Sequence, residues 1–186
     1  MSAHASFVEP HRAVALFGIE PGMHIADFGA GSGVYTIAMG KALAGSGHVY
    51  AIDVQQDLLR RIHNEATRQH LEVIGTLWAD IESVGSSKLA DSYIDIVLIS
   101  NLLFQVEHKD AVLFEAARIV KPRGKVIVID WTDSPPEGTQ RMGPHHSQLV
   151  SKDSVLALAY DAGLKHESDV HVGGHHYGIV LCKHPS

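Results

Sequence analysis

Three glycines, each separated by one residue, follow an acidic residue early in the chain, in the stretch Asp27-Phe28-Gly29-Ala30-Gly31-Ser32-Gly33. An apolar run precedes this stretch and a helical pattern begins at Val34, so it is predicted to be a strand-to-helix turn. Glycines at such a turn let the backbone approach a ligand closely, and the free N–H groups at the helix start face that ligand. The turn is the first candidate binding site.

Two kinds of ligand bind at glycine-rich turns of this kind, namely dinucleotides and S-adenosylmethionine. The spacing places Val34 where the dinucleotide pattern has a small residue. The Asp27 carboxylate is unfavourable beside a pyrophosphate but suits the ammonium and sulfonium charges of S-adenosylmethionine. Asp53, at the end of the next apolar run, can hold two ribose hydroxyls of either ligand. The pattern favours S-adenosylmethionine and leaves a nicotinamide-dependent oxidoreductase as an alternative.

Two histidine pairs, His145-His146 and His175-His176, fall in predicted loops at the other end of the chain. Neutral imidazole can act as a general base or bind a metal, and loop histidines can equally be solvated. Adjacent side chains point in different directions, so each pair offers at most one ligand, and no metal site is predicted. Asp130 and Asp133 are interpreted as residues of a strand-end turn.

The elements that would position these residues alternate along the chain, with short apolar runs followed by longer stretches of helical periodicity. This alternation predicts βαβ units and a doubly wound α/β sheet. The predicted strands are His24–Phe28, His48–Val54, Val73–Trp78, Ile94–Ser100 and Lys125–Trp131. The predicted helices are Pro10–Phe17, Val34–Leu43, Gln56–Gln69, Asp110–Val120 and Ser151–Ala162.

The C-terminal end departs from this alternation. Lys165–Val172 and Tyr177–Cys182 both resemble strands, but only Gly173–His176 separates them. That linker is too short for a parallel crossover, so an antiparallel hairpin is predicted. The sheet then has seven strands, mostly parallel. Residues 1–186 are expected to form one domain, with an N-terminal helix and possible lid in 1–20 and a catalytic core in 21–186.

Composition narrows the class of protein. The 186 residues carry a formal net charge of -6, so no broad cationic field would attract nucleic acid. The single cysteine, Cys182, cannot form an internal disulfide. The sequence shows no targeting segment and no apolar run that would span a bilayer. A cytoplasmic protein without a membrane or nucleic-acid partner is expected.

The motifs together resemble those of class I S-adenosylmethionine-dependent methyltransferases, in the type 11 group that includes ubiquinone and menaquinone C-methyltransferases. The resemblance rests on residues 25–33, 49–54, 78–81, 95–103 and 116–124, which are similar to five family motifs in the family's order. Arg123 departs from the pattern, because a glycine is usual there. The resemblance implies a Rossmann-like fold, S-adenosylmethionine as methyl donor and S-adenosylhomocysteine as product.

It also implies a set of site residues. Those expected to bind the cofactor are Asp27, Gly29, Ala30, Gly31, Tyr35, Asp53, Val54, Asp80, Ile81, Asn101 and Leu102. Tyr35 could cover the cofactor or pack against the sheet. His176 and His146 are the catalytic candidates. His176 is preferred because His176-Tyr177-Gly178 resembles a motif of some small-molecule members.

The expected reaction is methyl transfer to a small organic acceptor. The stretch Ser100–Leu103 lacks the proline-rich tetrapeptide of base-amine methyltransferases, and the lone cysteine argues against cytosine C5 and arsenite chemistry. A protein or RNA methyltransferase and a non-catalytic cofactor-binding module remain alternatives. The residues through Pro10 and Thr132–Gln148 are the candidate lids, and a homodimer could help to close the site.

Overall fold

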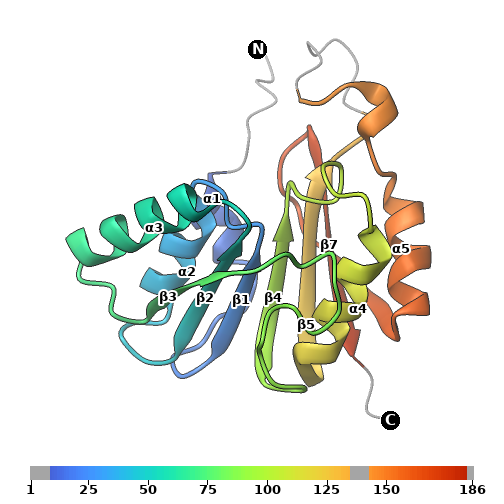
Figure 1. The fold of residues 1–186 in the computed structure, drawn as a ribbon. Helices are drawn as coiled ribbons and strands as arrows, with labels where there is room; N and C mark the ends of the chain where they lie inside the picture. Colours follow the sequence, from blue (N-terminus) through green and yellow to red (C-terminus); the bar gives the residue numbers. More distant parts are fainter. Residues whose placement is uncertain (1–8, 135–142, 184–186) are drawn as a thin grey trace.

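The computed structural model describes residues 9–134 and 143–183. Within them, one seven-stranded sheet has the order β3-β2-β1-β4-β5-β7-β6 and carries helices on both faces (Figure 1). The strands are β1 (His24–Phe28), β2 (His48–Asp53), β3 (Ile74–Trp78), β4 (Ile94–Ser100), β5 (Val120–Trp131), β6 (Leu164–Asp169) and β7 (His176–Lys183). The helices are α1 (Pro10–Val14), α2 (Val34–Ala42), α3 (Gln56–Arg68), α4 (Lys109–Ile119), the 3-10 helix η1 (His146–Gln148) and α5 (Lys152–Asp161).

The direction of the strands agrees with the sequence pattern. Strands β1 to β5 pair in parallel, and β7 is antiparallel to both of its neighbours, β5 and β6. In β4 only Asp95 and Ser100 are partly exposed, because helices cover both faces of the central strands. The predicted fold, a mostly parallel doubly wound sheet ending in an antiparallel hairpin, is confirmed.

Each face of the sheet has its own apolar core. On one face, α1 to α3 pack against the strands, and Met39 and Ile62 meet strand residues such as Ile25. On the other face, α4 and α5 contribute Leu113 and Val155. Burial of these side chains contributes ~1.5–3 kcal/mol each. The two cores fix the strands so that the carboxyl ends of β1 to β5 lie at one edge of the sheet.

Most predicted boundaries are correct to within one residue, and three elements differ by more. Helix α1 ends at Val14 rather than Phe17, because the chain tightens into i→i+3 turns there. Strand β5 begins at Val120 rather than Lys125. Val120 pairs with Ile94 and Lys125 pairs with Ile96, so a bulge accommodates Pro122, which has no N–H for the ladder.

The hairpin loop is also shifted. Strand β6 ends at Asp169 rather than Val172, and His176 is the first residue of β7 rather than part of the turn. The loop between the two strands is therefore 170–175. Its first residue remains tied to β7, since the Val170 N–H donates to the Gly178 carbonyl at 2.9 Å.

The candidate lids fall partly outside the described residues, which omit positions 1–8 and 135–142. The lid therefore remains a prediction. Arg123, the residue that departs from the family pattern, has φ 66°, a backbone conformation that a glycine adopts without strain. No helix of the described part is long and apolar enough to cross a membrane.

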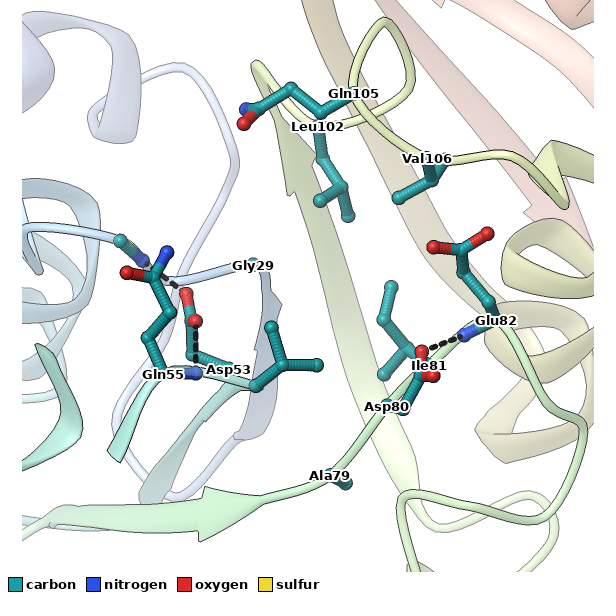
Figure 2. A pocket seen from close by; sticks show the side chains of 12 residues that line it. Gly29, Asp53, Gln55, Ala79, Asp80, Ile81, Glu82, Leu102, Gln105 and Val106 are labelled. Atoms are coloured by element: carbon teal, nitrogen blue, oxygen red, sulfur yellow. Dashed lines mark hydrogen bonds between the residues drawn. The ribbon is translucent and has the colours of Figure 1, made fainter. Parts of the chain in front are cut away.

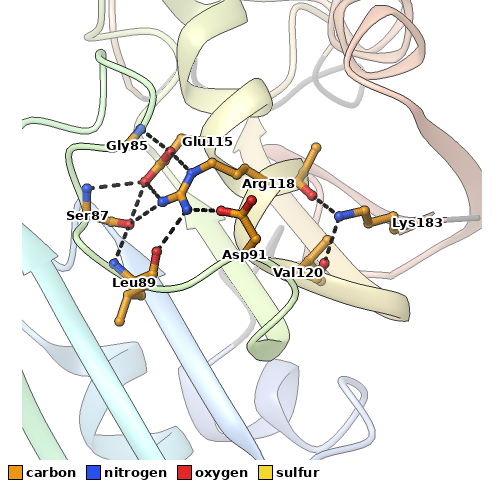
Figure 3. Close-up of polar contacts among 9 residues, drawn as sticks. Gly85, Ser87, Leu89, Asp91, Glu115, Arg118, Val120 and Lys183 are labelled. Atoms are coloured by element: carbon orange, nitrogen blue, oxygen red, sulfur yellow. Dashed lines mark hydrogen bonds and ion pairs between the residues drawn. The ribbon is translucent and has the colours of Figure 1, made fainter.

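The segment joining β3 to β4, residues 79–93, contains no helix, and a polar network centred on α4 holds its middle part (Figure 3). Glu115 of α4 is fully buried and accepts hydrogen bonds from the Gly85 N–H (2.6 Å) and from the Ser87 N–H and hydroxyl (3.2 and 2.5 Å). Arg118 pairs with Glu115 at 2.8 Å and with Asp91 at 2.5 Å. This network holds the pKa of the Glu115 carboxyl at about 2, despite its burial. It anchors the loop that leads from β3 toward the site.

Candidate functional site

The glycine turn lies between β1 and α2, as predicted. Gly29, Gly31 and Gly33 all have positive φ, at 67°, 54° and 80°. A Cβ at Gly29 would lie 2.7 Å from a Leu102 methyl, and one at Gly33 would lie 2.5 Å from Ile62. Glycine is thus required here both for the backbone conformation and for the close approach of neighbouring side chains.

Asp53 closes the turn from the end of β2. Its two carboxylate oxygens accept hydrogen bonds from the Gly31 N–H and the Gln55 N–H, both at 2.9 Å (Figure 2). The residue is 8% exposed and lines a cavity. Each carboxylate oxygen can accept a second bond, so the side chain still suits a ribose diol while it holds the turn in place.

The largest part of the site is a cavity of about 280 Å³, called here the cofactor groove, between the loops that follow β1, β2, β3 and β4 (Figure 2). The predicted cofactor residues that line it are Gly29, Gly31, Asp53, Val54, Asp80, Ile81 and Leu102. Five further lining residues were not predicted from the sequence, namely Gln55, Ala79, Glu82, Gln105 and Val106. Each of these residues lies within four positions of a predicted one, in a loop at the carboxyl end of a strand. That proximity in the sequence is the signal that could have identified them.

A second cavity of about 220 Å³, the Asp27 cavity, begins at the same glycines and extends along the start of α2. Its lining includes Asp27, Ala30, Tyr35 and Asn101, the remaining predicted cofactor residues. Tyr35 lines this cavity, and its ring stacks on Phe17, which follows α1, with the ring centroids 6.3 Å apart. Its covering of the cofactor remains a prediction.

Asp27 has an unusual electrostatic environment. The side chain is 2% exposed and accepts a 2.5 Å hydrogen bond from the Thr36 hydroxyl. Burial raises the pKa of the Asp27 carboxyl to about 7, and the nearby Asp53 charge adds to the increase, whereas the Thr36 hydroxyl lowers it. A buried carboxylate of this kind is stabilised by a cationic ligand.

A third cavity, of about 190 Å³, adjoins the Asp27 cavity and is called here the acceptor cavity. The two share Val34, Tyr35 and Asn101. The remaining walls of the acceptor cavity are Pro10, Ile129, Val172 and His176. The structure thus brings His176, from the start of β7, beside Val34 and Tyr35 at the start of α2.

His176 is held from two sides. Its Nε2 lies 2.9 Å from the Asn101 side-chain oxygen, and its ring packs on Trp131 with centroids 4.3 Å apart. Asn101 has φ 52°, in the left-handed region that asparagine tolerates better than most residues. Burial, and to a smaller extent the neighbouring His175, lowers the pKa of the His176 imidazole to about 4. The ring is therefore neutral at physiological pH.

The other candidates are placed differently. His146 is exposed in η1 and lines none of the cavities described here. Asp130 is buried in β5, where its carboxylate accepts the N–H groups of Leu103 (3.0 Å) and Trp131 (2.8 Å). Among residues 9–134 and 143–183, no group of three or more His, Cys, Asp and Glu side chains is placed to hold a metal ion.

The residues present fit S-adenosylmethionine. Asp53 suits the ribose hydroxyls, and Val54, Ile81 and Leu102 offer apolar walls for an adenine. The Asp27 carboxylate, in the adjoining cavity, suits the cationic methionine end. When bound, the cofactor supplies an electrophilic methyl group.

Comparison with known proteins agrees with this geometry. A methyltransferase-domain family model matches residues 19–167. The ubiquinone/menaquinone biosynthesis C-methyltransferase of Burkholderia orbicola is 31% identical over 127 residues, which are 66% of this chain and 51% of that protein. The chain thus spans about half the length of the curated relatives it matches.

Solved structures show the same fold. An S-adenosylmethionine-dependent methyltransferase from Aquifex aeolicus has a TM-score of 0.82 at 24% identity, covering 94% of this chain and 89% of that one. Geranyl diphosphate C-methyltransferase from Streptomyces coelicolor has a TM-score of 0.74 at 11% identity, covering 95% and 79%. The family match decides between the two ligand classes: the chain belongs to the class I S-adenosylmethionine-dependent methyltransferases.

Proposed function

We propose that the protein transfers the methyl group of S-adenosylmethionine to a small organic molecule bound in the acceptor cavity. The observation that carries this proposal is the adjacency of two cavities that share Val34, Tyr35 and Asn101. A methyl group carried in the Asp27 cavity would face a molecule seated against His176. The C-methyltransferase relatives, which are named for ubiquinone and menaquinone biosynthesis and for geranyl diphosphate, support a small acceptor.

Methyl transfer depends more on the alignment of the two reactants than on catalytic functional groups of the protein. A lone pair or π pair of the acceptor forms the new bond to the methyl carbon, the carbon–sulfur bond breaks, and its electron pair neutralises the sulfonium. Holding the two reactants in line supplies ~7–11 kcal/mol of the barrier reduction. Fixed walls on rigid elements, such as Ile129 of β5 and Tyr35 of α2, serve that purpose.

His176 is the proposed proton acceptor. Its lowered pKa keeps the imidazole neutral, which is the form that can accept a proton, although as a weak base. A weak base is sufficient when the proton leaves with or after methyl transfer, because the methylated acceptor is then strongly acidic. Asn101 fixes the ring orientation through the contact to Nε2.

The test measures transfer of labelled methyl from S-adenosylmethionine into small-molecule, protein and RNA fractions of an extract. The expected result is label in the small-molecule fraction, and label only in protein or RNA would support the corresponding alternative. For His176→Phe we expect a fall in kcat of ~10²-fold or more with unchanged S-adenosylhomocysteine affinity. His146→Ala is the matched variant outside the cavity, and an equal loss there would remove the assignment to His176.

A non-catalytic cofactor-binding module is the remaining alternative. It predicts that S-adenosylhomocysteine raises the Tm while no fraction accepts label. A ligand at 100 times its Kd stabilises by ~2.7 kcal/mol, which is a readily measured shift for a domain of this size.

A further inference from the structure

A cavity of about 150 Å³ lies at the opposite end of the strands from the cofactor groove. Its walls come from the start of β4, the bulge at the start of β5 and the loop between α1 and β1. Asp95 and Ile96 line it, whereas Ser100, at the other end of β4, lines the Asp27 cavity. A strand rises ~3.3 Å per residue, so Asp95 and Ser100 are ~16 Å apart along β4. The cavity is thus separate from the methyl-transfer site, and it is called here the basic cavity.

The charged residues that line the basic cavity are three cations and one carboxylate, namely Lys121, Arg123, Lys125 and Asp95. The carboxylate is engaged on both oxygens, because Asp95 pairs with the Lys121 ammonium at 2.7 Å and accepts the His24 N–H at 2.8 Å. The Lys125 ammonium lies against the loop between α1 and β1, since a Cβ at Gly18 would be 3.3 Å from its Nζ. The four charges sum to +2.

A thiol on the neighbouring strand reports that two of these cations lie close together. Burial raises the pKa of the Cys182 thiol and the Glu167 carboxylate adds to the increase, whereas the Lys125 and Arg123 charges lower it. Cys182 of β7 is the direct pairing partner of Lys125. The guanidinium and the ammonium therefore act on one place at this end of the sheet.

The backbone conformation of Arg123 is unfavourable for an arginine. Its φ of 66° lies in the left-handed region, which glycine adopts without strain and which crowds the Cβ of any other residue. Glycine is also the residue usual at this position in the family pattern. Residues held in such conformations concentrate at functional sites, where the strain is retained together with the side chain. Here the retained side chain is a guanidinium beside the basic cavity.

The size and charge of the basic cavity indicate the ligand class. A water occupies ~30 Å³ of liquid, so the cavity has about the room of five waters, which is enough for one phosphoryl group with the rest of its ligand outside. Guanidinium binds phosphate oxygens in pairs, and an ammonium acts as a point charge beside them. A phosphate monoester has a charge of about −1.5 to −2 at pH 7, which matches the local sum. A long polyanion matches less well, because the whole chain has a formal net charge of -6.

We propose that the basic cavity binds the phosphoryl group of a small phosphate monoester through Arg123 and Lys125. Lys121, fixed by its ion pair with Asp95, adds the third positive charge. This binding site lies outside the proposed function, since it shares no lining residue with the cofactor groove, the Asp27 cavity or the acceptor cavity.

The test titrates the isotopically labelled full chain with glycerol 3-phosphate, inorganic phosphate or glycerol at pH 8 and low ionic strength, and follows the backbone amides by NMR. We expect saturable binding of glycerol 3-phosphate with a dissociation constant of ~1 mM or less, at least as tight as that of inorganic phosphate, and none of glycerol. The largest shifts should fall on Ile96, Gly124 and Lys125.

Several results would overturn the inference. Binding of inorganic phosphate alone would assign the cavity to the free ion, and tighter binding of a short RNA at the same amides would assign it to a polyanion. Unsaturable shifts would show that no site exists. Shifts that are largest at 29–33 would place the phosphate at the glycine turn instead.

Two glycine variants separate this site from general charge attraction. Arg123→Gly removes the guanidinium and relieves the backbone, so it should unfold in urea at no lower a midpoint than the wild type and bind glycerol 3-phosphate at least fivefold more weakly. Lys88→Gly is the matched control, because Lys88 is an exposed cation with φ 60° that does not line the basic cavity, and its binding should equal that of the wild type. Unchanged binding by Arg123→Gly, or equal weakening by both variants, would refute the inference.

Discussion

Replacement of Asp27 by Asn tests the electrostatics of the cofactor site most directly. The carboxyl is 2% exposed, and burial raises its pKa to about 7 from an ordinary 3.8. In the free protein it is therefore about one tenth ionised at pH 6 and about nine tenths ionised at pH 8. Binding of a cationic ligand requires the ionised form, so binding and ionisation of this group are linked.

The magnitude for binding follows from that linkage. Between pH 6 and pH 8 the affinity for S-adenosylhomocysteine, which retains the ammonium group, should rise about tenfold, or ~1.4 kcal/mol. The Asp27→Asn variant keeps an oxygen for the Thr36 hydroxyl but loses the charge. A charge-assisted hydrogen bond contributes ~1.5–3 kcal/mol, so the variant should bind ~10- to 100-fold more weakly at pH 8 and show no such pH dependence.

Ionisation of Asp27 has opposite effects on binding and on folding: it favours a cationic ligand but lowers the free energy of unfolding. The folded-state pKa lies above the unfolded value, so the native state binds the proton more tightly and stability from this group falls as the pH rises from about 4 to about 7. At ~1.4 kcal/mol per pKa unit, the upper bound for this loss is ~4 kcal/mol. Without ligand, Asp27→Asn should therefore be more stable than the wild type at pH 8.

Titration calorimetry with S-adenosylhomocysteine at pH 6, 7 and 8 and urea unfolding at pH 5 and 8 measure the two effects. Asp57→Asn is the matched control, because the Asp57 side chain is 76% exposed and pairs only with the neighbouring Arg60 within the part of the chain that the structure describes. A wild-type affinity that is flat with pH, or an Asp27→Asn variant that is both weaker in binding and less stable, would refute the reasoning.

Three further predictions concern the residues around the groove. Glu115→Ala should lower the free energy of unfolding in urea titrations by ~1–3 kcal/mol for each of the Gly85 and Ser87 N–H groups that it leaves without an acceptor, while Arg118 keeps its pairing with Asp91; the wild type should lose this contribution as the pH falls from about 4.5 to about 2. Gly29→Ala should weaken S-adenosylhomocysteine binding more than tenfold by calorimetry, since its Cβ would meet Leu102 at 2.7 Å in a backbone with φ 67°. Asp130→Asn should cost ~1–3 kcal/mol of stability in urea titrations, because an amide cannot accept both the Leu103 and the Trp131 N–H groups.

The cofactor side of the site could be predicted because it is local in the sequence. The glycine spacing, the acidic residue before it and the acidic residue at the end of the second strand all lie within 27 residues, 27–53. Parallel strands bring their carboxyl ends to one edge, so the loops after β1 to β4 were expected to meet there. All eleven predicted cofactor residues line the groove or the Asp27 cavity.

The acceptor side could not be predicted in the same way. The sequence offered two histidine pairs and nothing to choose between them except a short resemblance. The Asn101–His176 contact joins residues 75 positions apart, and it exists because β7 inserts between β5 and β6 and so begins beside the end of β5. Packing of this kind depends on the order of strands in the sheet.

The sequence by itself determined the fold class, and it favoured S-adenosylmethionine and named the loops expected to bind it, because apolar periodicity and glycine spacing are local properties of the chain. Only the tertiary structure decided the raised pKa of Asp27, the lowered pKa of His176 and the placement of His176 beside Asn101. Burial sets both pKa values, and burial is the joint result of helices and strands that are distant in the sequence. Side-chain identity shows which groups can ionise, and the packed structure determines which of them do.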